Sequence, residues 1–401
     1  MTELSPIPDH VPASLVYDFD VFAAPELHHE PHRSAMRLHK DAPRVFFSPR
    51  NGGHWVIVGA VEALEILRRH DIFSNTPEFC STLRKPATLP NLSDPPDHTE
   101  YRRIINPAFT PGAVNAMEAG IREMAVALIE DVLAKGQTEF VADIAKRFPV
   151  NIFLGMVGAP LSDRDYLLEY AELGVRHPTR EGRNEASAEL GRYVMRAFEE
   201  RRRKPGTDLM SRVLAAEFQG RKLNDEELLG MGLLLMLGGL DTVASMLSFI
   251  MLHLGRNQGQ YRELIEDPSL LPAAVEELMR VHGVASMQRG VTHDNEFLGI
   301  AFKKYDRLHM LPQLWGLDER IVDRPAAVDF RRETSPHLAF GGGPHRCIGS
   351  HLARVEIRVF LEEWTKRIPA FKVAGDWDGR TSGGVVWTPL TLPLEWKTQA
   401  H

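Results

Sequence analysis

The chain has 401 residues, of which 43% are hydrophobic and 25% are charged, and its formal net charge is −7. This composition is ordinary for a soluble globular protein, and the acidic balance argues against a nucleic-acid partner. The first dozen residues lack the basic and apolar regions of a signal peptide, and no uninterrupted apolar run of about 18 residues predicts a membrane anchor.

The hydrophobic pattern predicts a fold that is mainly α-helical, with small β-sheets toward the two ends of the chain. Asn51-Gly52-Gly53 separates two strand-like runs and predicts a hairpin over residues 44–58. The expected helices that follow include 61–70, 111–134, 163–173 and 186–203. Strand-like patterns return at 308–311, 384–387 and 390–396. No linker, repeat or low-complexity segment interrupts the chain, so we expect residues 1–401 to form a single domain.

The longest helical pattern runs from about 224 to 255 and should cross the molecule. Asn224 and Glu227 have the spacing of a capping box at its start, and Gly255 is a stop signal at its end. Apolar residues cover nearly all of its surface up to Leu240. We therefore expect this helix to be buried on most sides.

The run Gly238-Gly239-Leu240-Asp241-Thr242 interrupts this helix. Two glycines inside a helix cost about 1 kcal/mol each relative to alanine, so they need a reason. One interpretation is close packing against another helix, with Asp241 held in a salt bridge. The other is a local distortion at a reaction site, where Asp241 and Thr242 handle protons.

Cys347 follows a glycine-rich run, Phe340-Gly341-Gly342-Gly343-Pro344-His345-Arg346, and precedes a helical pattern. Glycines let a backbone approach a ligand closely, and the N–H groups at a helix start stabilise a thiolate. The other cysteine, Cys80, lies in an unlike context, so we expect no disulfide, which fits a reducing, cytoplasmic compartment. From the residues alone, Cys347 is a small buried hydrophobe, a nucleophile or one axial ligand of a haem.

Two polar pairs have helical spacing. His98 and Arg102 stand four apart after Pro95-Pro96, and Glu277 and Arg280 stand three apart. Each pair alone is compatible with a solvated helix face, so neither identifies a site without further evidence.

Together and in chain order, these motifs resemble those of cytochrome P450 enzymes, and among them the bacterial camphor hydroxylase group. The matching motifs are His98/Arg102, Gly238–Thr242, Glu277/Arg280, Phe330/Arg332 and Phe340–Gly349. The resemblance covers the chain from Trp55 onward. It implies the P450 fold and a monooxygenase reaction on haem b (iron protoporphyrin IX). It also implies electrons from a separate [2Fe–2S] ferredoxin and its reductase, because the chain is too short for a reductase domain.

The resemblance also implies a role for each matching residue. Cys347 would be the axial ligand of the haem iron. The haem propionates would be bound by His98, Arg102, Arg289 and His345. The loop that carries the cysteine would be held by Glu277, Arg280 and Arg332. A ferredoxin would dock near Arg102, Arg103, Arg346 and Arg354.

On the oxygen side, the resemblance assigns the positioning of oxygen to Thr242 and the delivery of protons to Asp241. The substrate pocket would be lined by Leu234, Leu237, Gly238, Thr242, Ala285 and Val386, with Trp387 narrowing it. Since this lining is almost wholly apolar, it predicts a small hydrophobic substrate of terpenoid or norisoprenoid type.

Three positions depart from the camphor group. Pro86 stands where a tyrosine holds the substrate ketone, so camphor is not the expected substrate. Met287 replaces an aspartate that faces a propionate, and Tyr305 replaces a turn glycine. If that turn needs a positive φ, the tyrosine is strained there or the turn differs.

Two other functions compete with a monooxygenase. One is a haem-based binding or sensing protein of the same fold that does not turn over oxygen. Asp241 and Thr242 argue against it, because a sensor needs no proton delivery. The other is a cysteine hydrolase with His345 or His351 as its base, for which the sequence shows no oxyanion arrangement.

Overall fold

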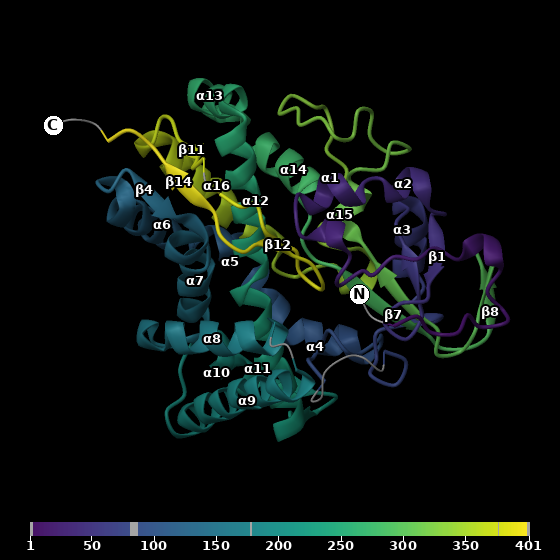
Figure 1. Ribbon diagram of the computed structural model, residues 1–401. Coiled ribbons are helices and arrows are strands. Elements are labelled where there is room, and N and C mark those ends of the chain that lie inside the picture. The colour runs from purple at the N-terminus through teal and green to yellow at the C-terminus, as the bar shows by residue number, and fades with distance from the viewer. Residues whose placement is uncertain (1–2, 81–86, 177–178, 376, 399–401) are drawn as a thin grey trace.

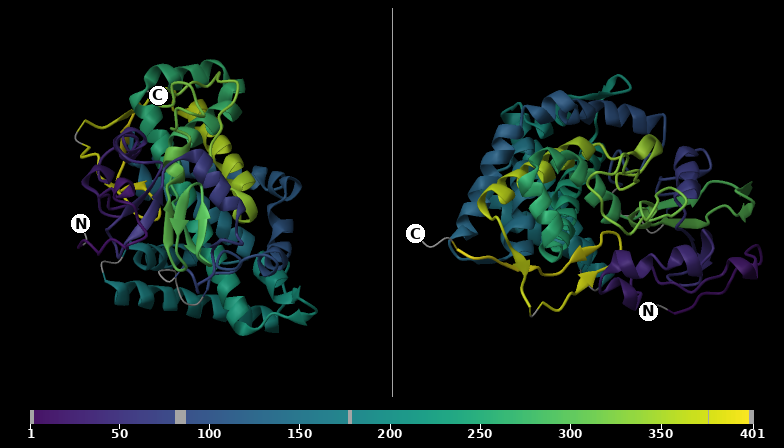
Figure 2. Two further views of the ribbon diagram at one scale, coloured as in Figure 1. Left: turned by 90° about the vertical axis from the view of Figure 1, so that its right-hand side faces the viewer. Right: turned by 90° about the horizontal axis from the view of Figure 1, so that it is seen from above.

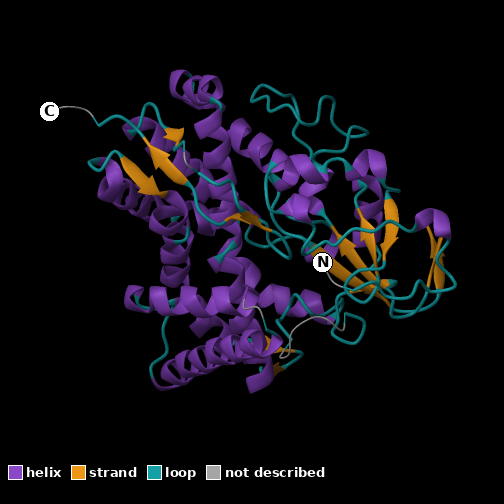
Figure 3. Ribbon diagram, viewed as in Figure 1, coloured by secondary structure: helices purple, strands orange, loops and turns teal. Residues whose placement is uncertain are grey.

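The computed structural model describes residues 3–80, 87–176, 179–375 and 377–398 (Figure 1). Helices dominate it (Figure 3). The longer helices are α3 (Ala60–Arg68), α4 (Asp97–Ile105), α6 (Glu118–Leu133), α7 (Arg147–Val157), α8 (Arg164–Arg176), α9 (Arg180–Arg203), α10 (Leu209–Ala215), α11 (Asp225–Leu240), α12 (Thr242–Arg256), α13 (Gln258–Glu266), α14 (Leu271–Val281) and α16 (Ser350–Arg367). The short ones include α1 (Pro31–Ala35), α2 (Leu38–Asp41), α5 (Pro111–Asn115), α15 (Pro312–Trp315) and the 3₁₀ turns η5 (Leu161–Asp163) and η7 (Gly343–His345).

The strands form small sheets, as expected, but the largest sheet is not local to either end of the chain. Its strand order is β1 (Val45–Ser48), β2 (His54–Ile57), β10 (Arg307–Met310), β7 (Met287–Val291), β3 (Phe73–Ser74). The 44–58 hairpin is confirmed, with β1 and β2 antiparallel, and β2 then pairs in parallel with β10. The chain thus returns after about 250 residues to complete the N-terminal sheet.

The remaining strands are short. They form a sheet of β11 (Lys372–Val373), β14 (Pro393–Glu395) and β4 (Gln137–Glu139), and the pairs β5–β6 (Glu217–Phe218, Arg221–Lys222), β8–β9 (Asn295–Phe297, Ile300–Phe302) and β12–β13 (Thr381–Ser382, Thr388–Pro389). The strand predicted at 384–387 is wrong: only Val386 there makes a bridge, with Ala285. The C-terminal segment instead packs on the N-terminal one, since Thr381 N donates to His28 O (Figure 2).

Most predicted helices are confirmed, with shifted ends. The helix predicted at 61–70 is α3, that at 163–173 is α8, and that at 186–203 begins earlier, as α9. The single helix predicted at 111–134 is wrong, because Ala116 and Met117 separate α5 from α6. Thr110 caps α5, and its side chain accepts a hydrogen bond from Ala113 N.

The central helix begins as predicted. The Asn224 side chain accepts the Glu227 N–H, and the Glu227 carboxylate accepts the Asn224 N–H, which completes the capping box. It is not one continuous helix, however: α11 ends at Leu240, Asp241 has φ −126° and ψ −36°, and α12 continues to Arg256. The local distortion therefore occurs at the residue pair suspected of handling protons.

Among the described residues, the stretch Asp225–Arg256 is the one helical segment long and apolar enough to cross a membrane. Its most apolar window has a mean hydropathy of 1.8, and 59% of that window is buried inside the fold. Figure 1 shows α11 and α12 passing through the middle of the molecule, with other helices on several sides. This is the pattern of a core helix.

Several histidines are buried and uncharged in the fold. Burial lowers the pKa of His32 and His54 to about 4 and that of His309 to about 3. His282 lies between the rings of His32 and His253, at 5.3 and 5.1 Å, and burial lowers its pKa as well. Neither ring nitrogen of His282 has a hydrogen-bond partner among the described residues.

Acid should therefore destabilise the protein. Below pH 6.5 the histidines of the unfolded chain take up protons, whereas these buried rings stay neutral. The free energy of unfolding therefore has its full value above pH 6.5. It falls, by about 1.4 kcal/mol per pH unit for each ring, until the pH reaches about 4. Denaturant unfolding at pH 7.5, 6 and 5 measures the slope.

The variant His282→Phe should have a shallower pH slope than wild type, because it removes one such ring without removing a hydrogen bond. A matched change at the solvent-accessible His29, His29→Phe, should leave the slope unaltered. Equal stability of wild type at pH 7.5 and pH 5 would contradict this account.

Candidate active site

The loop before α16 turns back sharply on itself. Cys347 N donates to Phe340 O at 2.8 Å, and Gly341 and Gly343 have φ values of +66° and +64°. A Cβ on Gly343 would lie 2.2 Å from Leu67 O at the end of α3. A side chain at Gly343 is thus excluded both by backbone conformation and by space.

The sulfur of Cys347 is surrounded by protein yet has an open side. The residue is exposed, but burial raises the pKa of its thiol, against the opposing effects of Gly349 N and of nearby arginines led by Arg102. A Cβ on Gly349 would meet only the Cys347 sulfur, at 3.9 Å. The thiol is therefore protonated until a positive partner binds it, and a metal ion is such a partner.

Two histidines and two arginines gather close to this loop. The rings of His98, in α4, and His345, in η7, lie 4.1 Å apart. Burial, followed by the charges of His345 and Arg102, lowers the pKa of His98 to about 3. Burial also lowers the pKa of Arg289, in β7, and that of Arg102. The structure thus brings together all four residues that the sequence assigned to propionates.

Asp94 is a site residue that the sequence reasoning missed. It lies 3.6 Å from His345 Nε2, which is too long for a hydrogen bond, and its carboxylate accepts from Ser74 Oγ at 2.5 Å and Asn75 N at 3.1 Å. The pattern Asp94-Pro95-Pro96 before α4 was the available signal. One carboxylate beside two guanidiniums, of which that of Arg289 is buried, leaves positive charge that an acidic cofactor would offset.

Arg102 also binds the cysteine loop directly. Its Nη1 donates to Arg346 O at 2.6 Å and to Pro344 O at 3.5 Å. It therefore links α4 to the residue just before Cys347, and this contact was not among the sequence expectations.

Glu277, Arg280 and Arg332 form a buried ion network. Arg280 binds both carboxylate oxygens of Glu277 at 2.7 Å, and Arg332 Nε binds Glu277 Oε1 at 3.1 Å. Ser335 Oγ and Asp329 N also donate to Glu277. Burial opposes ionisation of Glu277, but these donors, Arg280 foremost, outweigh it and lower its pKa to about 2.

This network holds the segment that leads to the cysteine loop. Arg280 Nη1 also donates to Gly316 O at 2.6 Å and Pro325 O at 2.7 Å. Arg332 Nη1 donates to Asp323 O at 2.9 Å. Two side chains thus bind carbonyls of an irregular segment that has no strand or helix of its own to satisfy them.

A second ion pair connects α14, the helix that carries Glu277 and Arg280, to α16. Arg354 pairs with Glu276, and its guanidinium lies 4.6 Å from the centre of the Phe340 ring. The sequence assigned Arg354 to a docking surface. The structure places its charge against Glu276 and Phe340, so it is engaged within the fold.

The two glycines of the central helix do different things. A Cβ on Gly239 would lie 2.6 Å from the Phe153 ring, so this glycine permits close packing of α11 on α7. Gly238 is exposed, and a Cβ there would meet nothing within 4 Å. Thr242 Oγ1 donates to Gly238 O at 3.4 Å. Close packing and an open site, which were alternatives from the sequence, thus occur at neighbouring residues.

The six residues of the expected pocket wall all lie among the described residues. Leu234 and Leu237 are half-buried on α11, and Ala285 and Val386 form an isolated β-bridge. Trp387 was expected to narrow the pocket and does not: it is fully buried in the core against His32, 5.3 Å between ring centres. Pro86 lies outside the described residues.

The other two departures have structural explanations. Met287 packs against the cysteine loop, because a Cβ on Gly341 would lie 2.4 Å from its Cε. Tyr305 does adopt the positive φ of a turn glycine, at +72°, and its ring stacks on Phe79 with 5.7 Å between centres. The turn therefore has the backbone conformation of a glycine turn although residue 305 is a tyrosine.

Comparisons with known proteins decide the family. The family model "Cytochrome P450" matches residues 167–367. A probable cytochrome P450 127A1 of Sinorhizobium fredii is 34% identical, over 98% of this chain and 97% of that relative. The chain belongs to the cytochrome P450 family. It is accordingly a P450 monooxygenase, an oxidoreductase, and its cofactor is haem b.

Other relatives show how broad the similarity is. A steroid C26-monooxygenase of Mycobacterium tuberculosis is 33% identical over 71% of this chain and 78% of that relative. The crystal structure of CYP101J2 superposes with a TM-score of 0.89 at 33% identity, covering 98% of this chain and all of that one. CYP101C1 gives the same TM-score at 32% identity. The mainly helical P450 fold is therefore confirmed over nearly the whole chain.

The residues present fit a haem. The loop offers the sulfur of the exposed Cys347, and the charge of Arg102 acts on its thiol. Arg289 and the imidazoles of His98 and His345 lie close to Arg102, since their charges influence one another. A haem needs an axial ligand and neighbours for two propionates. Among the described residues no group of three or more histidine, cysteine, aspartate or glutamate side chains is placed to hold a metal ion.

Proposed function

We propose that this protein is a haem-thiolate monooxygenase that hydroxylates a small hydrophobic substrate of terpenoid or norisoprenoid type. It acts as one haem-binding domain of residues 1–401, soluble and cytoplasmic, and takes electrons from a [2Fe–2S] ferredoxin and its reductase. The observation that carries the proposal is the convergence of the exposed Cys347 with two guanidiniums and two imidazoles from three separate elements. The CYP101 structures support a ferredoxin-dependent bacterial enzyme.

When bound, the haem supplies the activation of O₂ and the oxidation of a C–H bond. Cys347 holds the iron, while His98, Arg102, Arg289 and His345 bind and orient the propionates. Glu277, Arg280 and Arg332 keep the cysteine loop in position.

On the oxygen side of the site, the apolar side chains of α11 and of the Ala285–Val386 bridge exclude water and hold the substrate. Asp241 moves protons from solvent toward the site. Thr242 holds a proton at its hydroxyl next to Gly238, where the helix leaves room.

The role of Thr242 is tested by removing its hydroxyl. In Thr242→Val, the product formed per electron pair consumed should fall roughly tenfold or more, because protons then reach the site without control. Thr242→Ser restores the hydroxyl and should recover most of the coupling. Both variants should keep the wild-type spectrum of the reduced CO adduct. Equal coupling in Val and Ser variants would remove Thr242 from the proposed mechanism.

Turnover distinguishes the enzyme from a haem-based binder or sensor. Holoenzyme is first screened for spin-state shifts with terpenoid ketones and ionones, and the ligands that shift it are then incubated with ferredoxin, reductase and NADH. The proposal expects hydroxylated product. Ligand-induced shifts without product from any of them would favour the sensor.

The docking surface can be narrowed from the structure. Arg102 and Arg354 are engaged within the fold, whereas Arg346 is exposed. The Arg103 side chain is 72% exposed and forms an ion pair with Glu100 on the same helix. Arg103→Glu should slow reduction by an acidic ferredoxin about tenfold at low salt and leave substrate binding unchanged.

Arg33 provides the matched control for Arg103. It is exposed and pairs with Glu30 at the same spacing, but on α1. The ferredoxin should reduce the Arg33→Glu variant at the wild-type rate. If Arg103→Glu is also reduced at that rate, the docking proposal is wrong.

A further inference from the structure

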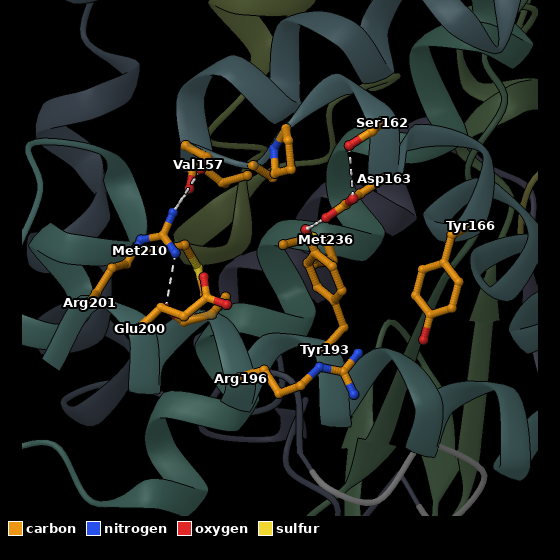
Figure 4. Close-up of a pocket in the computed structure, with 14 residues that line it drawn as sticks. Val157, Ser162, Asp163, Tyr166, Tyr193, Arg196, Glu200, Arg201, Met210 and Met236 are labelled. Atoms are coloured by element: carbon orange, nitrogen blue, oxygen red, sulfur yellow. Dashed lines mark hydrogen bonds between the residues drawn. The ribbon is translucent and has the colours of Figure 1, made fainter. Parts of the chain in front are cut away.

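A cavity of about 460 Å³ lies outside the candidate active site and shares none of its residues (Figure 4). It is enclosed by the end of α7 and the turn after it, by one face of α9, and by single residues of α8, α10 and α11. Its volume is in the range of small-molecule sites, which is about 300–1,000 Å³. The P450 reaction makes no use of it.

The cavity lies beside a close contact between α9 and α11. A Cβ on Gly232 would lie 2.3 Å from Val194, and a Cβ on Gly191 would lie 3.3 Å from Leu229. About one turn further along both helices, Ala197 and Met236 line the cavity. The glycines thus permit the close contact of the two helices, and the cavity lies next to it.

The floor of the cavity is apolar and adaptable. Met210 and Met236 are fully buried, and Val157 is nearly so. Methionine side chains are flexible and polarisable and accommodate ligands of different shape. Met236 directly precedes Leu237, which belongs to the expected substrate pocket, and the two side chains point about 100° apart around α11.

The rim carries hydrogen-bonding groups. The Tyr193 hydroxyl donates to Asp163 Oδ2 at 2.7 Å, and the Arg196 guanidinium lies 6.0 Å from the centre of the Tyr193 ring. Arg196 and Glu200 are exposed at the mouth. Figure 4 shows Arg201 and Met210 on one side of the cavity, Tyr166 on the other, and Met236 and Tyr193 between them in this view.

The wall carries charges of both signs. Its carboxylates are those of Asp163 and Glu200, and its guanidiniums are those of Arg196 and Arg201. Arg201 pairs with Asp208 at 2.8 Å and donates to Val157 O at 2.6 Å. The two carboxylates of the wall therefore outnumber its remaining guanidinium, and the wall disfavours an anionic ligand, whose charge would lose hydration without gaining a counter-charge.

We propose that this cavity is a second small-molecule site, which takes a neutral amphipathic ligand. Its apolar body lies on Met210 and Met236, and a carbonyl or hydroxyl group meets Tyr193 and Arg196 at the rim. The ligand lies between the end of α7 and α9, beside the contact of α9 with α11. The proposal does not depend on the proposed substrate or on turnover.

The probe is 2-naphthol, with 2-naphthoate as its anionic counterpart of the same size. Holoenzyme is first saturated with 4-phenylimidazole, so that the haem side is occupied, and 2-naphthol is then titrated by calorimetry. We expect one site per chain for 2-naphthol and at least about tenfold weaker binding of 2-naphthoate. A crystal structure of this ternary complex should show 2-naphthol on Met210 and Met236.

Two variants fill the cavity from opposite walls, Ala197→Trp in α9 and Ala159→Phe in the turn after α7. Each should weaken 2-naphthol binding at least about tenfold. The control is Ala188→Trp, on an exposed position of α9 outside the cavity. It should bind as wild type does. Each variant is used only if its thermal midpoint and CO spectrum match wild type, and the crystal structure needs no variant.

The proposal is overturned if 2-naphthol fails to bind the saturated wild-type enzyme, or if both filled variants bind it as well as wild type. Density for 2-naphthol elsewhere, with this cavity empty, would also overturn it. None of these outcomes bears on whether the protein is a monooxygenase, because turnover is measured separately.

Discussion

Replacing Cys347 with serine should abolish the red-shifted Soret band of the reduced CO adduct and reduce turnover at least about a thousandfold, or ~4 kcal/mol of activation free energy. A serine hydroxyl stays protonated and cannot replace the thiolate as a ligand. Electron donation by the thiolate to the iron is what favours O–O cleavage. The reduced CO difference spectrum and product formation with saturating electron donor measure the two effects.

Cys80 is the matched control for this substitution. It is buried, its sulfur donates to Ser74 O at 3.3 Å, and burial raises the pKa of its thiol to about 12. Cys80→Ser should therefore keep both the band and the activity. A red-shifted band that survives in Cys347→Ser, or disappears in Cys80→Ser, would assign the iron ligand elsewhere.

Replacing Glu277 with glutamine should lower the free energy of unfolding by about 3–5 kcal/mol and reduce the haem content of the purified protein. The loss removes the counter-charge of two arginines, and Arg280 is only 1% exposed. Its guanidinium would remain buried with hydrogen bonds to carbonyls but without an anion. Chemical denaturation at pH 7 and the haem absorbance per chain measure the outcome.

Glu100→Gln tests whether burial is the reason. Glu100 forms an Arg–Glu pair with the same separation of three residues, but on the surface with Arg103. Exposed pairs contribute about 0–1 kcal/mol, so this variant should remain close to wild type. Similar losses in both variants would mean that the Glu277 network has no special part in the fold.

The Glu277 network also predicts a pH dependence. The folded-state pKa of Glu277 is lowered to about 2. The contribution of its ionised carboxylate to the free energy of unfolding is therefore present above the ordinary glutamate pKa of about 4.5 and is lost as the pH falls toward 2. The buried histidines lose their contribution at higher pH, between 6.5 and about 4. Acid unfolding should thus begin with the histidines, before Glu277 is protonated.

Local features could be predicted from the sequence because their partners lie in the same segment. The capping box of Asn224 and Glu227 and the hairpin at 44–58 are contacts over a few residues, and both formed as expected. The break at Asp241 was more difficult. Two glycines indicated it, but the sequence could not say that Gly239 packs on Phe153 while Gly238 borders open space.

Errors arose where distant segments decide the structure. A single bridge forms where a strand was predicted at 384–387. On the side away from β1, β2 pairs with β10, which lies far along the chain. Trp387 follows Val386, which was expected to line the pocket, but is buried in the core. Adjacent residues of an extended chain face opposite sides, so one shift in register reverses their surroundings.

By itself the sequence determined the family and the chemistry, because Cys347 and the paired motifs are read by residue type and short spacing. The tertiary structure decided which charges meet. His98, Arg289 and His345 come from three distant segments, and Asp94 joins them without any signal strong enough to be noticed in isolation. Arg354, which was expected at the docking surface, pairs instead with Glu276. The physical reason is that burial and proximity across the fold set the charge state and availability of a side chain, and neither depends on local sequence alone.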